Sequence, residues 1–269
     1  MIRPFAISSW LLATVALSFP VAPAFAQNAT LPIQVVPDDG RLYGHFPYAE
    51  ADPATLVDAP PGFAVGQECK VQPAMIPDLT RLVAAAHDAH LGADLRGVSC
   101  FRSIAHQERV FCERHGRKGE CVDPAVRAES VAPPGHSEHG TGYAIDFGAR
   151  PQGRCPDVDD CFADTAVGRW LLLNAPDYGF ELSFPAANAQ GVTWEPWHWR
   201  WVGTTNSEPG AIAARTSFAE ARRRFPANPR IPTIVVRVIA QPPLPSAEVE
   251  GNATTPASGQ PPQYQGAPN

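Results

Sequence analysis

Proline restricts this chain more than any other residue, because it fixes the backbone and removes a hydrogen-bond donor. The sequence holds 30 prolines in 269 residues, about twice the ordinary usage. We therefore expect many interruptions of regular structure and a loose segment somewhere. Residues 241–269 hold seven of the prolines and a single aromatic residue. This tail cannot bury enough surface to offset its ordering entropy, and we predict that it is disordered.

The composition of the whole chain is that of a globular protein. It is 44% hydrophobic and 18% charged, which suits one domain with appendages and argues against full disorder. Lysine and arginine total 21 against 27 acidic residues, so the net charge is −6. A broad basic face for nucleic acid is therefore not expected.

Residues 1–26 have the pattern of a secretory signal peptide. A short positive start at Arg3 precedes an apolar run, and Ala24-Phe25-Ala26 is a small-x-small cleavage site. We place the cut before Gln27. The alternative is an uncleaved membrane anchor, but the span is short and broken by prolines. We expect export to the periplasm or the extracellular space, with no transmembrane segment after cleavage.

Six cysteines follow this segment, and an even number in an oxidising compartment indicates disulfides. Six cysteines allow 15 pairings, and the sequence alone does not choose among them. Proximity favours Cys112–Cys121 and Cys155–Cys161, each closing a short polar loop, which leaves Cys69–Cys100. The alternative is a zinc site of thiolates, which the lack of any Cys-x-x-Cys pair disfavours.

The organisation along the chain predicts four regions. They are the signal peptide at 1–26, an extended proline-rich arm at 27–64, a folded domain at 65–240 and the tail at 241–269. Periodicity, caps and β-propensity predict helices over residues 77–91, 103–115, 166–175 and 217–224, and strands over 95–101, 142–147, 180–184, 193–202 and 231–239.

Two clusters carry side chains suited to chemistry. Residues 133–148 hold His136, Glu138, His139 and Asp146, and residues 193–201 hold Glu195, His198 and Arg200 amid four tryptophans. A catalytic zinc needs three protein ligands and an open position for water, beside a carboxylate that takes the proton. His139, Asp146, His198 and Glu195 can supply that set.

Other interpretations of these clusters remain open at the level of pattern. A Glu-x-x-His spacing often arises by chance, and the spacing to Asp146 does not choose between His136 and His139. Ser137 is a candidate nucleophile, but Gly-His-Ser-Glu-His lacks the second glycine of a nucleophile elbow. Residues i and i+3 point to opposite faces of a regular strand, so a bulge or edge at Pro196 must turn both Glu195 and His198 inward.

The two clusters together resemble a known family. Ser137-x-His139-x-x-Gly142-x-Ala144-x-Asp146, followed by Glu195-Pro-Trp-His198-Trp-Arg, is similar to the signature of the VanY-type zinc carboxypeptidases, which are related to the VanX dipeptidases. Ser99-Cys-Phe-Arg102-Ser103 with Gln107, and the stretches around residues 174–185 and Pro47-Tyr48, resemble further family segments in the right order. The similarity covers roughly residues 45–205 and includes neither the cysteines nor the two tails.

The resemblance implies a fold and a set of roles. The fold would be α+β, a small antiparallel sheet flanked by helices, as in Hedgehog and DD-peptidase domains. His139, Asp146 and His198 would hold Zn²⁺, Glu195 would be the general base, and Arg102 would stabilise the oxyanion or hold a substrate carboxylate. Ser103, Gln107 and Ser137 would contact substrate or merely cap loops and helices. Independently of the resemblance, a ring of Trp194, Trp197, Trp199 and Trp201 would keep the site partly dry, but for two of the four we expect ordinary core packing instead.

These roles imply a secreted zinc carboxypeptidase that removes the C-terminal D-alanine from peptidoglycan stem peptides. The alternatives are a D-Ala-D-Ala dipeptidase, a wall endopeptidase, and a non-catalytic wall-binding module with structural zinc. The presence of Glu195 and Arg102 argues against the last, because a structural zinc site has no need of a base. D,D- or L,D-specificity, tetrapeptide or pentapeptide preference and oligomeric state do not follow from the sequence.

Overall fold

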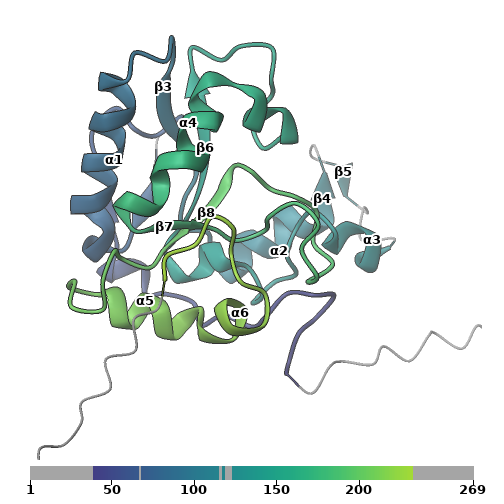
Figure 1. Ribbon diagram of the computed structural model, residues 1–269. Helices are drawn as coiled ribbons and strands as arrows, with labels where there is room; N and C mark the ends of the chain where they lie inside the picture. Colours follow the sequence, from purple (N-terminus) through teal and green to yellow (C-terminus); the bar gives the residue numbers. More distant parts are fainter. Residues whose placement is uncertain (1–38, 67, 115–116, 119–122, 233–269) are drawn as a thin grey trace, which may run out of the picture.

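The computed structural model describes residues 39–66, 68–114, 117–118 and 123–232 (Figure 1). The signal peptide, the tail and nearly all of the expected strand at 231–239 lie outside the described residues. Among those that are described, no helix combines the length and apolar character needed to cross a membrane.

A four-stranded antiparallel sheet forms the centre of the fold. Its spatial order is β3 (Asp94–Ser99), β6 (Ala144–Arg150), β8 (His198–Trp201) and β7 (Phe180–Leu182). Two short antiparallel pairs accompany it: β1 (Val57–Asp58) with β2 (Lys70–Val71), and β4 (Glu113–Arg114) with β5 (Arg117–Lys118). This small antiparallel sheet with helices around it confirms the α+β expectation.

In the part of the chain that the structure describes, six α-helices lie around the sheet (Figure 1). They are α1 (Ile76–Asp88), α2 (Ile104–Cys112), α3 (Pro124–Ala128), α4 (Ala166–Asn174), α5 (Ala211–Ser217) and α6 (Ala219–Arg224). Single turns of 3₁₀-helix lie at Pro53–Thr55, Pro73–Met75, Glu138–Thr141, Asp160–Asp164 and Ala175–Tyr178. In the view of Figure 1, α1 lies at the left, and α2, α3 and the β4–β5 pair lie at the right.

The two faces of the sheet differ because strand side chains alternate. One face is apolar and packs into the core, with helices α1 and α4 contributing leucines and valine. Its buried strand residues are Leu95, Ile145, Phe147, Phe180, Leu182, Trp199 and Trp201. The other face carries Asp146, Glu181, His198 and Arg200, all of them buried as well. The register therefore gathers the charged side chains of three strands on one side.

The N-terminal arm is tied into the domain. Phe46 and Leu56 are buried, β1 pairs with β2, and Phe63 belongs to the core. A Cβ on Gly97 would lie 2.5 Å from the Phe63 ring, so this strand position accommodates Phe63 only because it is glycine. The core thus begins before residue 65.

Several element boundaries differ from the sequence expectation. Helix α1 ends at Asp88 rather than near residue 91, because His90 takes a left-handed conformation with φ 52°. The expected strand at 193–202 is regular only from His198 onward, after a turn in which the His198 N–H donates to the Glu195 carbonyl at 3.0 Å. The helix expected at 217–224 is α6, which begins at Ala219; a separate helix, α5, precedes it and ends at Ser217, next to the fully buried Phe218.

Helix α3, like α5, was not expected from the sequence. Helix α3 begins at Pro124, and the Asp123 side chain accepts hydrogen bonds from the Ala125 and Val126 amides. An N-cap aspartate followed by a proline at N1 is a recognisable start signal, but the segment is too short to show a period.

Two of the three expected disulfides form. Cys69 is bonded to Cys100, and Cys155 to Cys161. The third expected pair includes Cys121, which lies outside the described residues.

Gly179 provides a test of the packing behind the sheet. It has φ 81°, and a Cβ there would lie 2.8 Å from Trp201 Nε1 and 2.9 Å from the Gly203 Cα. We expect Gly179→Ala to lower the free energy of unfolding by about 3 kcal/mol, from left-handed strain plus overpacking. Gly62 is the matched control, because it has φ 77° but nothing within 4 Å of the added Cβ. Gly62→Ala should lose only about 1 kcal/mol. Equal losses in urea unfolding would contradict the packing argument.

Candidate metal centre and active site

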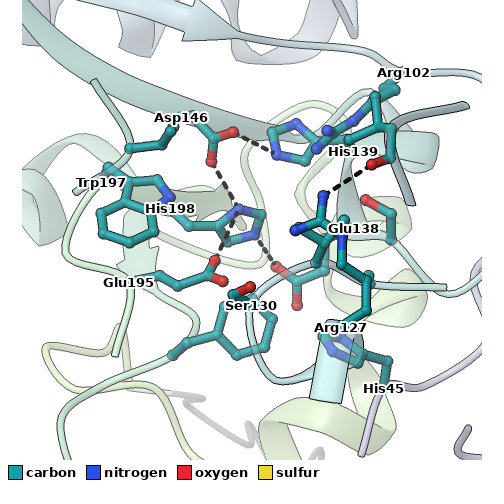
Figure 2. A pocket seen from close by; sticks show the side chains of 16 residues that line it. His45, Arg102, Arg127, Ser130, Glu138, His139, Asp146, Glu195, Trp197 and His198 are labelled. Carbon is teal, nitrogen blue, oxygen red and sulfur yellow. Dashed lines mark hydrogen bonds and ion pairs between the residues drawn. The ribbon is translucent and has the colours of Figure 1, made fainter. Parts of the chain in front are cut away.

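Three buried side chains from separate elements converge at one point. His139 lies on the 3₁₀ turn Glu138–Thr141, Asp146 lies in β6, and His198 begins β8 directly opposite Asp146. His139 Nε2 is 3.1 Å from Asp146 Oδ2, and His198 Nδ1 is 3.0 Å from Asp146 Oδ1 (Figure 2). Their ligand atoms all lie within 4.8 Å of one another. The structure thus brings together the three residues expected to bind the metal.

Each histidine has its other ring nitrogen occupied. His139 Nδ1 donates to the Cys100 carbonyl at 2.7 Å, and His198 Nε2 donates to Glu138 Oε2 at 3.0 Å. A ring N–H held by a carbonyl or carboxylate is the usual outer partner of a metal-binding histidine. His139 Nε2 is buried, and no described residue gives it a hydrogen bond of acceptable geometry. His139 Nε2 and His198 Nδ1 therefore face the same space as the Asp146 carboxylate, and the set fits a divalent metal.

The charges around this point suit a cation. Although burial opposes ionisation, the two histidines hold the pKa of Asp146 well below its usual range. Burial by itself lowers the pKa of His198, but the hydrogen bonds that its ring donates to Asp146 and Glu138 raise it to about 10. Burial lowers the pKa of His139. In the protein without metal, the carboxylates thus favour a protonated, positively charged His198. A zinc ion would have to displace that proton in order to bind.

Glu195 lies at the edge of this cluster. The turn at residues 195–198 places Glu195 Oε2 3.9 Å from His198 Nδ1, so the expected irregularity at Pro196 is confirmed. Burial raises the pKa of Glu195 to about 8, and the negative charges of Asp146 and Glu138 add to the effect. A carboxyl group with such a pKa can both hold and release a proton near neutrality.

A cleft of about 470 Å³ opens over these side chains. Arg102, Ser137, Trp197 and Glu195 line it together with the three ligands. Burial lowers the pKa of Arg102, although the negative charges of Asp146 and Glu195 act in the opposite direction. One guanidinium nitrogen of Arg102, Nε, is buried without a partner among the described residues. The cleft therefore presents a charged donor beside the acid and the metal ligands.

Two of the residues expected to contact substrate lie elsewhere. The Ser103 hydroxyl accepts from the His106 amide at 3.1 Å and so caps the start of α2. Gln107 is buried and donates to the Ala132 carbonyl. Neither lines the cleft. Gln107 instead holds the loop that forms one wall of it.

The expectation that two of the four tryptophans belong to the core is confirmed. Only Trp197 lines the cleft. Trp199 and Trp201 alternate with His198 and Arg200 along β8, so they point to the opposite face and are fully buried in the core. His136, the competitor of His139, is half-buried and contacts the Pro134 carbonyl, away from the ligands.

Sequence reasoning missed several residues of the site. Glu138 was in the first cluster, but without a role; it contacts His198 directly. His45 of the arm lines the cleft, where its Nε2 lies 2.8 Å from the Ala128 carbonyl, and burial lowers its pKa to about 4. Phe184 also lines the cleft and packs against His198 with ring centroids 5.0 Å apart. Strand alternation could have found Arg200, two residues beyond His198; nothing local indicates His45.

A second group of ligand-type side chains is not a metal site. Cys155, Asp159 and Cys161 lie close together. However, the two cysteines are joined in a disulfide and have no thiolates to offer.

The fold and the site define a class of protein. A buried His-Asp-His set with a carboxylate and a guanidinium beside it, in an open cleft of an α+β domain, is the arrangement of a metal-dependent hydrolase with one metal ion. The chain matches the family model for VanY, D-alanyl-D-alanine carboxypeptidase, over residues 68–204. It belongs to this family.

Named relatives agree with that membership. YodJ of Bacillus subtilis is 39% identical over 115 residues, which are 42% of this chain and 40% of YodJ. This chain therefore aligns with less than half the length of YodJ. The bifunctional D-Ala-D-Ala dipeptidase and carboxypeptidase VanXYC of Enterococcus gallinarum is 32% identical over 140 residues, 51% of this chain and 70% of VanXYC. The solved structure of the LD-carboxypeptidase LdcB is similar with a TM-score of 0.51 and 27% identity, covering 65% of this chain and 79% of that one.

Metal binding tests the ligand assignment directly. We expect one equivalent of Zn²⁺ to bind the wild type, and His139→Ala to weaken binding by at least a hundredfold because one of three ligands is lost. His136→Ala is the matched control, three residues away in the same loop. Isothermal titration calorimetry measures both. An equal loss in His136→Ala would show that the loop, and not the His139 imidazole, determines binding.

Proposed function

We propose that this chain is an exported zinc carboxypeptidase that removes the C-terminal D-alanine from peptidoglycan stem peptides. The observation that carries the proposal is the position of Glu195, whose carboxylate lies 3.9 Å from the ligating nitrogen of His198 and lines the same cleft. A purely structural zinc site needs no such acid and would close the fourth position. Here the cleft leaves that side open.

Zinc is the metal that the donor set favours, because two imidazoles and one carboxylate suit its coordination. When bound, it would supply an activated water at neutral pH and polarise the peptide carbonyl. Glu195 Oε2 would take the proton of that water and later deliver it to the nitrogen of the leaving alanine. The Arg102 guanidinium would hold the substrate carboxylate or the charge that develops on the carbonyl oxygen.

The proposed substrate class follows from the relatives. VanXYC is named for D-Ala-D-Ala dipeptidase and carboxypeptidase activity, and LdcB for LD-carboxypeptidase activity. The activities of VanXYC act on D-Ala-D-Ala, and LdcB recognises peptidoglycan. For this chain, an exported enzyme would meet stem peptides of the wall and not a cytoplasmic dipeptide. The two disulfides among the described residues support an oxidising compartment.

Alanine release tests this proposal. We expect the purified protein to release free alanine from tetrapeptide or pentapeptide stems, with loss of release on addition of a chelator. Glu195→Gln should lower kcat about a thousandfold, because it removes the base while keeping the shape of the side chain. Glu220→Gln is the control, since Glu220 is an exposed residue of α6 outside the cleft.

The substrates in the same assay separate the alternatives. Hydrolysis of free D-Ala-D-Ala with no release from stems would favour a dipeptidase. Cleavage inside cross-linked wall peptides would favour an endopeptidase. If the protein binds zinc but hydrolyses none of these substrates, and Glu195→Gln leaves zinc binding unchanged, the chain is a binding module and not a carboxypeptidase.

A further inference from the structure

A line of alternating buried charges leads away from the metal centre on the polar face of the sheet. His198 Nε2 contacts Glu138 Oε2 at 3.0 Å, and Glu138 Oε1 accepts from Arg200 Nη1 at 2.8 Å. Arg200 Nε donates in turn to Glu181 Oε1 at 2.9 Å, and Arg222 Nε donates to the same oxygen at 2.7 Å. The side chains of Glu138, Arg200 and Glu181 are each only 1% exposed. Such a chain is costly to bury unless every member is paired.

Glu138 is the member next to the ligand, and both of its oxygens are fully engaged. Oε2 accepts from His198 and, at 2.6 Å, from the Ser183 hydroxyl. Oε1 accepts from Arg200 and, at 3.2 Å, from the Tyr48 hydroxyl of the N-terminal arm. These four hydrogen bonds hold the carboxylate in one orientation.

That orientation determines which nitrogen of His198 meets the metal. Because Glu138 receives the Nε2 proton, Nδ1 is the ring nitrogen that faces Asp146 and Glu195 and that would turn a lone pair to a metal in place of its proton (Figure 2). A flipped ring would put a ring carbon in the place of Nδ1 and would remove one of the two hydrogen bonds that Glu138 Oε2 accepts, which is costly in a buried site. Phe184 packs against one side of the ring and His139 against another, so the ring has little freedom to adjust.

The far end of the chain is held by the segment after α6. Glu181 Oε2 accepts from the Ile231 amide at 3.3 Å, and Arg222 Nη2 donates to the Ile231 carbonyl at 3.1 Å. The Leu182 amide, one residue after Glu181, donates to the Pro229 carbonyl at 3.1 Å. Residues 229–231 lie more than 30 residues beyond His198 in the sequence. They are connected to it through the buried side chains of Glu181, Arg200 and Glu138.

We propose that Glu138, held from behind by Arg200 and Glu181, is a positioning residue that fixes His198 for metal binding. This inference rests on the proposed zinc site. Neither Glu138 nor Glu181 needs to touch the substrate, and both act through the imidazole.

The test is zinc affinity, measured by competition with a chromophoric chelator. Glu138→Gln keeps the shape but removes the charge, and an amide cannot accept hydrogen bonds from both sides. We expect the zinc Kd to rise about tenfold or more, the range found for outer partners of metal-binding histidines. Glu181→Gln should raise it by a smaller factor, because it acts one step further away. Glu220→Gln, an exposed glutamate that also pairs with two arginines, should leave it unchanged.

Two further measurements separate positioning from simple stabilisation. The visible spectrum of the cobalt-substituted protein should change in Glu138→Gln, because it reports the geometry of the ligands. If Glu138→Gln does not fold, Ser183→Ala and Tyr48→Phe each remove one hydrogen bond to Glu138 and keep its charge. Each should raise the zinc Kd by a factor of a few.

The outcomes are distinct from those for catalysis. An unchanged zinc Kd in Glu138→Gln, with lower stability of the metal-free protein, would overturn the proposal and leave Glu138 a structural residue. A wild type that binds no zinc would overturn it as well. A wild type that binds zinc but releases no alanine would defeat the proposed carboxypeptidase, while a raised Kd in Glu138→Gln would still support the positioning role.

Discussion

The pairing of β6 with β8 is the constraint on which the rest of the site depends. In this register, Asp146 lies directly opposite His198 and Ala144 opposite Arg200. Side chains alternate along a strand, so a slip of one residue would exchange the ligands for Ile145 and Trp199. The fully buried Ile145, Trp199 and Trp201 on the other face resist that slip, because it would move them out of the core. The apolar face thus fixes the positions of the metal ligands.

This arrangement requires one face of the sheet to bury several charges. Asp146, Glu138 and Glu181 face two histidines and Arg200, and each described carboxylate in this row has at least one cationic or donor partner. Pairing of this kind rarely stabilises a fold more than apolar residues would. Its retention on one face of the sheet is consistent with a role in binding a cation. Arg200 Nη2 has no hydrogen-bond partner among the described residues, so the pairing of buried charges is incomplete at this atom.

The sequence predicted the sheet, the ligands and the irregular turn at Pro196, because these depend on local pattern and on a long two-part signature. It also predicted that two of the four tryptophans belong to the core, but not which two; alternation within β8 places Trp199 and Trp201 on the core face. The sequence could not predict that His45 and Tyr48 are site residues. They lie about 90 residues from the ligand loop in sequence, and only the tertiary path of the arm brings Tyr48 within 3.2 Å of Glu138. Gln107 faces the Ala132 carbonyl for a similar non-local reason.

The two histidines of the metal centre are held in place by different kinds of contact. His198 depends on a side-chain carboxylate and the charges behind it. His139 depends on the backbone: its Nδ1 donates to the Cys100 carbonyl, and its own carbonyl accepts from the Arg102 amide at 3.2 Å. The Cys69–Cys100 disulfide and the bond from the Phe101 amide to the Lys70 carbonyl anchor that stretch to β2. The same stretch carries Arg102 into the cleft, so the end of β3 positions a ligand and the guanidinium together.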